Sequence, residues 1–215
     1  MSKNKKMLLS LPVIFAVEVI FVIILDSSGM EENYVSALSM TLFYSVLAAY
    51  ALCLYFREFV DSTQRMRRRE FLISSAIGSF LMLYLNIVFG AMRADATGNL
   101  ISQNQEGLNA AAAALPFLAF IRSVVCAPIV EETIFRYILQ GWLREKIKKG
   151  GAFFAVLISA TLFALGHIAT PADLIQYLPI GLLLGVIYEK TRCISLTICI
   201  HSVNNLIAFI ARNML

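Results

Sequence analysis

Long apolar runs, separated by short polar segments, dominate the sequence. A run of about 20 apolar residues is long enough to cross a bilayer as a helix, and seven runs approach that length. They cover residues 7–25, 34–56, 71–92, 111–143, 151–168, 174–189 and 193–212. Pro116 and Pro128 fall inside the fourth run and predict a kink there. The pattern predicts an all-α, polytopic membrane helix bundle of about seven transmembrane helices.

The composition also indicates a chain that lies mostly in lipid. Of its 215 residues, 59% are hydrophobic and 15% are charged, and the mean hydropathy is +0.76. Because a soluble domain carries about 25% charged residues, the composition argues against a soluble globular protein. The first run is longer than a signal-peptide core and lacks a small-residue cleavage site, so we expect an uncleaved span. We expect residues 1–105 to form peripheral amino-terminal helices and residues 110–215 to carry the chemistry.

The basic residues are distributed unevenly between the loops. Most of the 18 Lys and Arg residues precede the first run or follow the second, fourth and sixth runs, on one side of a seven-span bundle. Loops rich in Lys and Arg face the cytoplasm. We therefore expect a multi-pass protein of the cell (plasma) membrane with its amino terminus in the cytoplasm. Topology accounts for the net charge of +4, and we expect the lipid bilayer, and no nucleic acid, as a partner.

Three ionisable residues interrupt the fourth apolar run. They are Glu131, Glu132 and Arg136. Because a charge at bilayer depth costs roughly 2.5–3.5 kcal/mol on insertion scales, such groups usually serve a function. Glu132 and Arg136 are four residues apart and can pair on one helix face. A structural ion pair would account for Glu132 alone, since Glu131 is rotated by about 100° from it.

Both histidines of the chain also lie in apolar runs. His167 lies near the end of the fifth run, and His201 and Asn205 lie four residues apart in the seventh. A carboxylate and an imidazole, such as those of Glu131 and His167, can together hold and deprotonate a water molecule. An imidazole N–H and an amide on one helix face can donate to a developing oxyanion. These residues are therefore candidates for peptide hydrolysis by direct attack of water.

A metalloprotease-like zinc site is the chemical alternative. Two histidines and one glutamate match a known ligand set of catalytic zinc. The sequence lacks the H-E-x-x-H helix that usually marks such a site. We expect no cofactor, but the sequence alone leaves zinc open.

Four segments in order resemble the CAAX protease and bacteriocin-processing (CPBP) family of intramembrane glutamic endopeptidases. Residues 131–136 (EETIFR) resemble its E-E-x-x-x-R motif, and residues 163–167 (FALGH) resemble its F-x-x-x-H motif. Residues 201–205 (HSVNN) resemble its H-x-x-x-N motif, and residues 181–191 resemble its glycine-rich helix. The resemblance extends over 115–212 and points to a type II CAAX prenyl endopeptidase-like protein of the bacterial branch.

The resemblance implies a role for each motif. It implies that Glu131 and His167 act on the catalytic water. It implies that His201 and Asn205 bind the oxyanion, and that the other Glu and the Arg of the first motif are structural. The eukaryotic branch of the family trims prenylated CAAX proteins. Bacterial members are linked to peptide maturation and bacteriocin self-immunity, so a peptide or protein substrate is implied.

Two functions of other classes remain as alternatives. One is a membrane scaffold or immunity protein that binds a partner and for which catalysis is dispensable. The other is a transporter that uses the intramembrane charges as a proton or ion relay, although the sequence shows no repeated halves of the kind that many transporters have.

Overall fold

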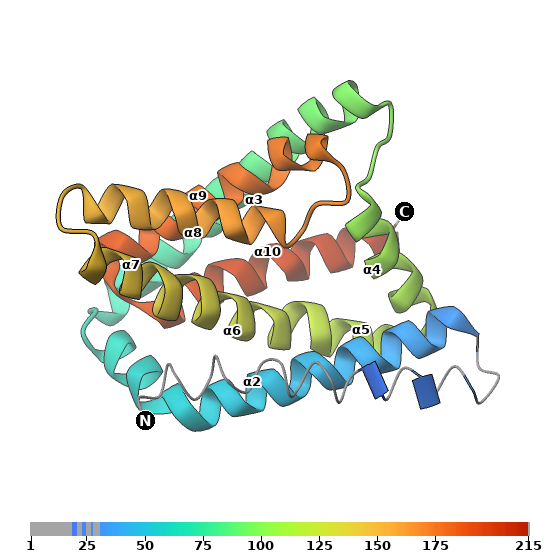
Figure 1. Cartoon of the computed structure of the whole chain (residues 1–215), viewed down its shortest axis with the longest axis horizontal. Coiled ribbons are helices and arrows are strands. Elements are labelled where there is room, and N and C mark those ends of the chain that lie inside the picture. The colour runs from blue at the N-terminus through green and yellow to red at the C-terminus, as the bar shows by residue number, and fades with distance from the viewer. Residues whose placement is uncertain (1–18, 21–22, 25–26, 28–30, 215) are drawn as a thin grey trace. The chain divides into compact units, whose positions relative to one another are not determined.

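Every element assigned among the described residues is a helix (Figure 1). The computed structural model describes residues 19–20, 23–24, 27 and 31–214. This confirms the predicted all-α membrane helix bundle. Most of the first apolar run lies outside the described residues. The predicted location of the amino terminus therefore stays a prediction.

The helices follow one another with short connections. In chain order they are α2 (Glu32–Gln64), α3 (Arg68–Thr97), α4 (Gln103–Ala114), α5 (Pro116–Phe120), the π-helix η1 (Ile121–Cys126), α6 (Ala127–Glu132), the π-helix η2 (Thr133–Gln140), α7 (Gly141–Lys146), α8 (Gly151–Leu165), the 3₁₀-helix η3 (Pro171–Asp173), α9 (Leu174–Thr191) and α10 (Ile194–Met214).

Four of the described helical segments are long and apolar enough to cross a membrane. They are Tyr34–Gln64, Arg68–Thr97, Pro171–Thr191 and Ile194–Arg212. They correspond to the second, third, sixth and seventh predicted runs, and the chain is therefore a membrane protein. The fifth run forms α8, which is apolar but only 15 residues long. The count of seven spans stays a prediction.

The fourth predicted run, 111–143, differs from the observed helices. Its alanine-rich start belongs to α4, and the chain leaves helical geometry at Leu115, where φ is −138° and ψ is 76°. The residue before a proline is disfavoured in the α region, and Pro116 is tolerated at the first position of α5. From Pro116 onward, consecutive helical segments continue to Lys146 and widen twice into π-helix, on either side of α6. Such π segments occur often at functional sites.

The structure divides into two compact units, which are described separately. Unit 1 contains the described residues up to Phe56, residues 107–130 and the residues from Asn205 on. Unit 2 contains residues 57–106 and 131–204. The predicted division into a peripheral part, 1–105, and a catalytic part, 110–215, stays a prediction.

In unit 2, α9 packs against both α3 and α8 (Figure 1). Two glycines of α9 allow its close approach to α8. A Cβ at Gly181 would lie 2.9 Å from the carbonyl oxygen of Ala160, and one at Gly185 would lie 3.1 Å from Cγ1 of Val156. Close packing of this kind is typical of small residues four apart at a helix contact. The apolar core beside this contact contains Met82, Phe163, Ile180, Leu184, Cys193, Leu196 and Ile200.

Candidate active site

The charged pair that helix spacing predicts is present and buried. Nε of Arg136 lies 3.2 Å from Oε2 of Glu132, and both side chains are fully buried. Nη1 of Arg136 also donates to the hydroxyl of Ser159 at 3.2 Å. That hydroxyl in turn donates to the carbonyl of Phe135 at 2.7 Å. The guanidinium is thus held by a carboxylate on its own helical run and by a hydroxyl from α8.

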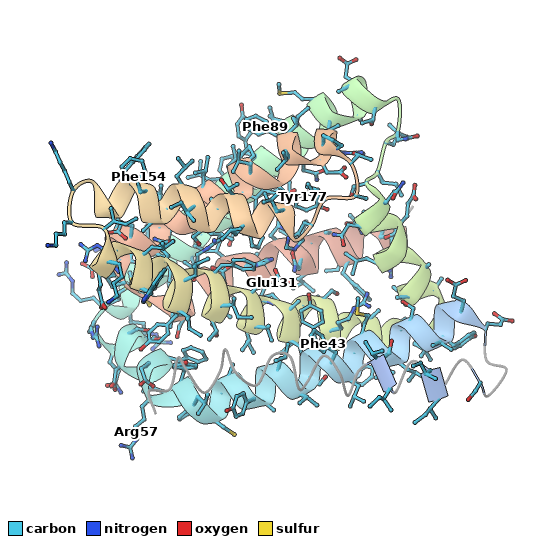
Figure 2. The ribbon with its side chains drawn as sticks, viewed as in Figure 1. Phe43, Arg57, Phe89, Glu131, Phe154 and Tyr177 are labelled. Atoms are coloured by element: carbon cyan, nitrogen blue, oxygen red, sulfur yellow. The ribbon has the colours of Figure 1, made fainter. Side chains whose placement is uncertain are left out.

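Glu131 faces both histidines. Its Oε2 lies 3.5 Å from Nε2 of His167 and 3.8 Å from Nε2 of His201. Glu131 is labelled in Figure 2 and is only 8% exposed. The structure therefore brings together three of the predicted catalytic residues, from α6, from the turn after α8 and from α10, all within unit 2. Their catalytic roles stay predictions.

The hydrogen bond of His167 fixes its tautomer. Its Nδ1 lies 2.8 Å from the carbonyl oxygen of Phe163, one helical turn earlier. Because a carbonyl oxygen can only accept, Nδ1 must carry the proton. Nε2, which faces Glu131, therefore carries a lone pair whenever the ring is neutral.

Glu132 holds the second histidine in the same way. Its Oε1 lies 3.1 Å from Nδ1 of His201, so a carboxylate accepts the Nδ1 proton. Glu132 thus lies between His201 and Arg136 and contacts both. This is more than the ion pair that the sequence predicted, since Glu132 also orients the ring that faces Glu131. Nε2 of His201 can donate only when the imidazole is doubly protonated.

The ring of Phe163 is the apolar support of the site. It is 2% exposed and lies 4.5 Å from the ring of His167 and 6.0 Å from that of His201, measured between centroids. The guanidinium carbon of Arg136 lies 4.9 Å from its centroid, within the range of a cation–π contact. The phenylalanine of the F-x-x-x-H segment therefore contacts three of the polar residues.

Asn205 belongs to unit 1, where it contacts the backbone near Pro128. In the π-helix η1 the N–H of Ala127 donates to the carbonyl of Arg122, five residues earlier. The next bond in this register would join residue 128 to Ser123, but proline has no N–H. Nδ2 of Asn205 donates to the Ser123 carbonyl instead, at 2.9 Å. The role predicted for Asn205 in oxyanion binding stays a prediction.

Two residues of the site were missed from the sequence. Ser159 precedes Phe163 by four residues on the same face of α8, so helical spacing could have identified it. Tyr177 stacks on the ring of His167, with centroids 5.2 Å apart and planes at 28°. No local sequence pattern marks Tyr177, because the contact depends on the turn between α8 and α9.

The residues that the sequence offered as zinc ligands are Glu131, His167 and His201. Within the described part of the chain, no group of three or more His, Cys, Asp or Glu side chains has an arrangement that could hold a metal ion.

Together, the fold and the site define an all-helical membrane protein with a buried glutamate–histidine cluster. Residues 113–207 match the family model described as "Type II CAAX prenyl endopeptidase Rce1-like". Over these residues the chain is therefore similar to the type II CAAX prenyl endopeptidase family, in agreement with the resemblance of its motifs.

Individual relatives support the same assignment at low identity. A UPF0177 protein in the abiGi 5' region of Lactococcus lactis subsp. cremoris is 27% identical, over 80% of this chain and 69% of the relative. YdiL of Bacillus subtilis (strain 168) is 32% identical, over 60% of this chain and 51% of YdiL. The membrane-embedded CAAX protease MroQ of Staphylococcus aureus (strain USA300) is 29% identical, over 64% of this chain and 57% of MroQ. No solved structure matches the chain. These likenesses support a role as a membrane protease.

Proposed function

We propose that the chain is an intramembrane endopeptidase in which Glu131 and His167 activate a water molecule for attack on a peptide bond. The observation that carries this proposal is the convergence of two imidazole Nε2 atoms on one buried carboxylate oxygen. A second glutamate, Glu132, is engaged by Arg136 and His201, so the two adjacent carboxylates are in different environments. Paired carboxylates with different environments are typical of acid–base sites.

The proposed reaction proceeds by direct addition of water. The water oxygen attacks the carbonyl carbon while one of its protons passes to Glu131. The C–N bond then breaks, and Glu131 returns the proton to the departing amine, which leaves a carboxylic acid and a free amine. The neutral Nε2 of His167 can accept a hydrogen bond from the same water and orient it. Nε2 and Oε2 lie 3.5 Å apart, so a water beside the pair can contact both atoms.

In this proposal His201 stabilises the oxyanion. Its Nδ1 proton is held by Glu132, so the ring donates from Nε2 as an imidazolium, whose charge the buried carboxylate balances. Preorganised donors of this kind often supply the largest single part of catalysis. Asn205 follows His201 by one turn of α10, and we keep its amide as a second proposed donor.

The substrate in this proposal is a peptide or protein that reaches the site from the membrane of the cell. CAAX-type trimming and the maturation of peptide or bacteriocin precursors, with self-immunity as a consequence, are the two substrate classes that the family resemblance suggests. We propose further that the protein lies in the plasma membrane with its amino terminus in the cytoplasm.

Cleavage by the reconstituted protein tests the proposal. Purified protein in liposomes is incubated with a quenched fluorescent peptide library, with and without a farnesylated cysteine, and new termini are identified by mass spectrometry. The wild type is expected to cleave, and His167→Ala is expected to lose cleavage while it still inserts and folds. The farnesylated and unmodified arms distinguish the two substrate classes.

A chelator arm tests the metal-free chemistry. Cleavage is expected to persist after treatment with a chelator. Elemental analysis of the active protein is expected to find less than one metal ion per chain. Stoichiometric zinc that is lost together with activity would replace this mechanism with a zinc-dependent one.

A further inference from the structure

The imidazole of His167 is flanked by two aromatic rings. The ring of Phe163 lies 4.5 Å away at 36°, and that of Tyr177 lies 5.2 Å away at 28°. Phe163 precedes His167 by one turn and also accepts its Nδ1 proton through its carbonyl. Tyr177 comes from a different helix, α9, so its contact depends on the conformation of residues 166–176. Figure 2 labels Tyr177 at the start of α9.

The hydroxyl of Tyr177 forms hydrogen bonds with the segment that follows α3. It lies 3.1 Å from the hydroxyl of Ser102, which is 3% exposed. It also accepts a hydrogen bond from Nδ2 of Asn104 at 3.2 Å. A tyrosine that only filled space between helices would not need both bonds, and the two bonds fix the height and tilt of its ring.

A buried ion pair links the turn between His167 and Tyr177 to the carboxyl-terminal end of α3. Oδ2 of Asp173 accepts from the backbone N–H groups of Ala169 and Thr170, at 3.0 Å and 2.9 Å. Its Oδ1 lies 3.5 Å from Nη1 of Arg93, and both side chains are nearly fully buried. Nη2 of Arg93 in turn donates to the carbonyl of Asn99. Since a buried ion pair adds little net stability, this one is better explained by the conformation that it fixes.

We propose that Tyr177 is a positioning residue that holds the imidazole plane of His167 so that Nε2 faces Glu131. The hydrogen bond to the Phe163 carbonyl fixes one atom of the ring, and the stacked ring of Tyr177 restrains rotation about that bond. The contacts with Ser102 and Asn104, together with the Arg93–Asp173 pair, keep Tyr177 in place. This inference rests on the proposed peptidase function, because it assigns a task to His167 in that reaction.

The test separates the ring of Tyr177 from its hydroxyl. Tyr177→Leu removes the ring, Tyr177→Phe keeps it, and Tyr84→Leu is a matched control at an exposed tyrosine of α3. We expect Tyr177→Leu to lower kcat by about 10- to 100-fold, the usual effect of a misplaced catalytic group, with KM changed by less than about threefold. Tyr177→Phe keeps the ring but loses the two bonds that hold it, so its kcat is expected to lie between those of Tyr177→Leu and the wild type, and Tyr84→Leu is expected to match the wild type. If Tyr177→Leu does not fold, Tyr177→Met takes its place with the same expectation.

A spectroscopic measurement supplies a readout that does not depend on cleavage. The chain has two histidines, so ¹³C-histidine labelling gives two ring signals, which a His201→Gln variant assigns. The His167 signal is expected to shift and broaden in Tyr177→Leu, and to do so less in Tyr177→Phe, which keeps the stacked ring. An unchanged His167 signal and wild-type kcat in Tyr177→Leu would overturn the inference. Glu131→Gln is measured in parallel, because cleavage retained in that variant would refute the proposed function instead.

Discussion

Oε1 of Glu132 lies 3.1 Å from Nδ1 of His201, although the two residues come from different helices. The carboxylate accepts the only proton that a neutral His201 carries, and so decides which ring nitrogen faces Glu131. A residue that the sequence identified only as half of an ion pair therefore also sets the protonation of a candidate catalytic histidine.

Glu132→Gln is expected to lower kcat by about 10²- to 10³-fold, the range seen when a donor to the oxyanion is lost. The amide keeps the size of the side chain but carries no negative charge, so it no longer balances the imidazolium from which His201 donates. Steady-state cleavage kinetics measure the effect, with KM expected to change little. A variant with the kcat of the wild type would show that His201 does not depend on Glu132.

The buried Glu132–Arg136 pair makes a prediction for stability. Arg136→Leu alone leaves a fully buried carboxylate without its cation and is expected to cost about 3–5 kcal/mol. The double variant Glu132→Gln, Arg136→Leu is expected to be more stable than Arg136→Leu alone, because no uncompensated charge remains. Unfolding in mixed micelles measures both. A double variant less stable than Arg136→Leu would contradict this account of the pair.

Asn205 and Pro128 make a coupled prediction in unit 1. Asn205→Ala removes the donor to the Ser123 carbonyl and is expected to cost about 1–3 kcal/mol. In a Pro128→Ala background residue 128 regains an N–H, which can bond to that carbonyl. The cost of Asn205→Ala is therefore expected to fall in the double variant, as a double-mutant cycle measures. If Asn205→Ala lowered the free energy of unfolding equally in both backgrounds, the contribution of the Asn205 hydrogen bond would not depend on Pro128.

The close approach of α8 and α9 predicts the effect of a single methyl group. Gly181→Ala places a Cβ 2.9 Å from a backbone oxygen of α8 and is expected to destabilise the protein by about 1–3 kcal/mol. Gly107→Ala is the matched control, since nothing lies within 4 Å of its Cβ position in α4. It is expected to be neutral or slightly stabilising by thermal unfolding. Equal effects of the two substitutions would argue against backbone contact at Gly181.

The sequence predicted the parts of this structure that depend on local periodicity. Apolar run length predicted the helical class, and the spacing of four residues predicted the Glu132–Arg136 pair. Run length misplaced the start of the fourth helix. The alanines before Pro116 are apolar and therefore joined the predicted run, but in the structure they end the preceding helix, α4. The wide π turns around α6 leave no simple periodicity in the sequence.

The site shows a similar division. Charge in apolar segments identified Glu131, His167 and His201, because each is costly in lipid and so carries a strong signal. Sequence spacing could not identify Tyr177 or the contact between Glu132 and His201. Both contacts join separate helices, and their geometry depends on turns that have no repeating pattern.

Cleavage by Glu131→Gln protein tests the central claim most directly. The substitution keeps the shape of the side chain but removes the group that takes the proton from water. Wild-type and variant proteins are purified, checked for equal thermal stability, and reconstituted in the same liposomes with the cleaved peptide. A His167→Ala, Glu131→Gln double variant serves as the baseline.

We predict that Glu131→Gln lowers kcat at least about a thousandfold, which combines the loss of a general base with a disturbed transition-state environment, and that the double variant is no slower. Cleavage by Glu131→Gln at a rate close to the wild type would contradict the mechanism. A biological phenotype that survived the loss of both residues would favour the scaffold or immunity function.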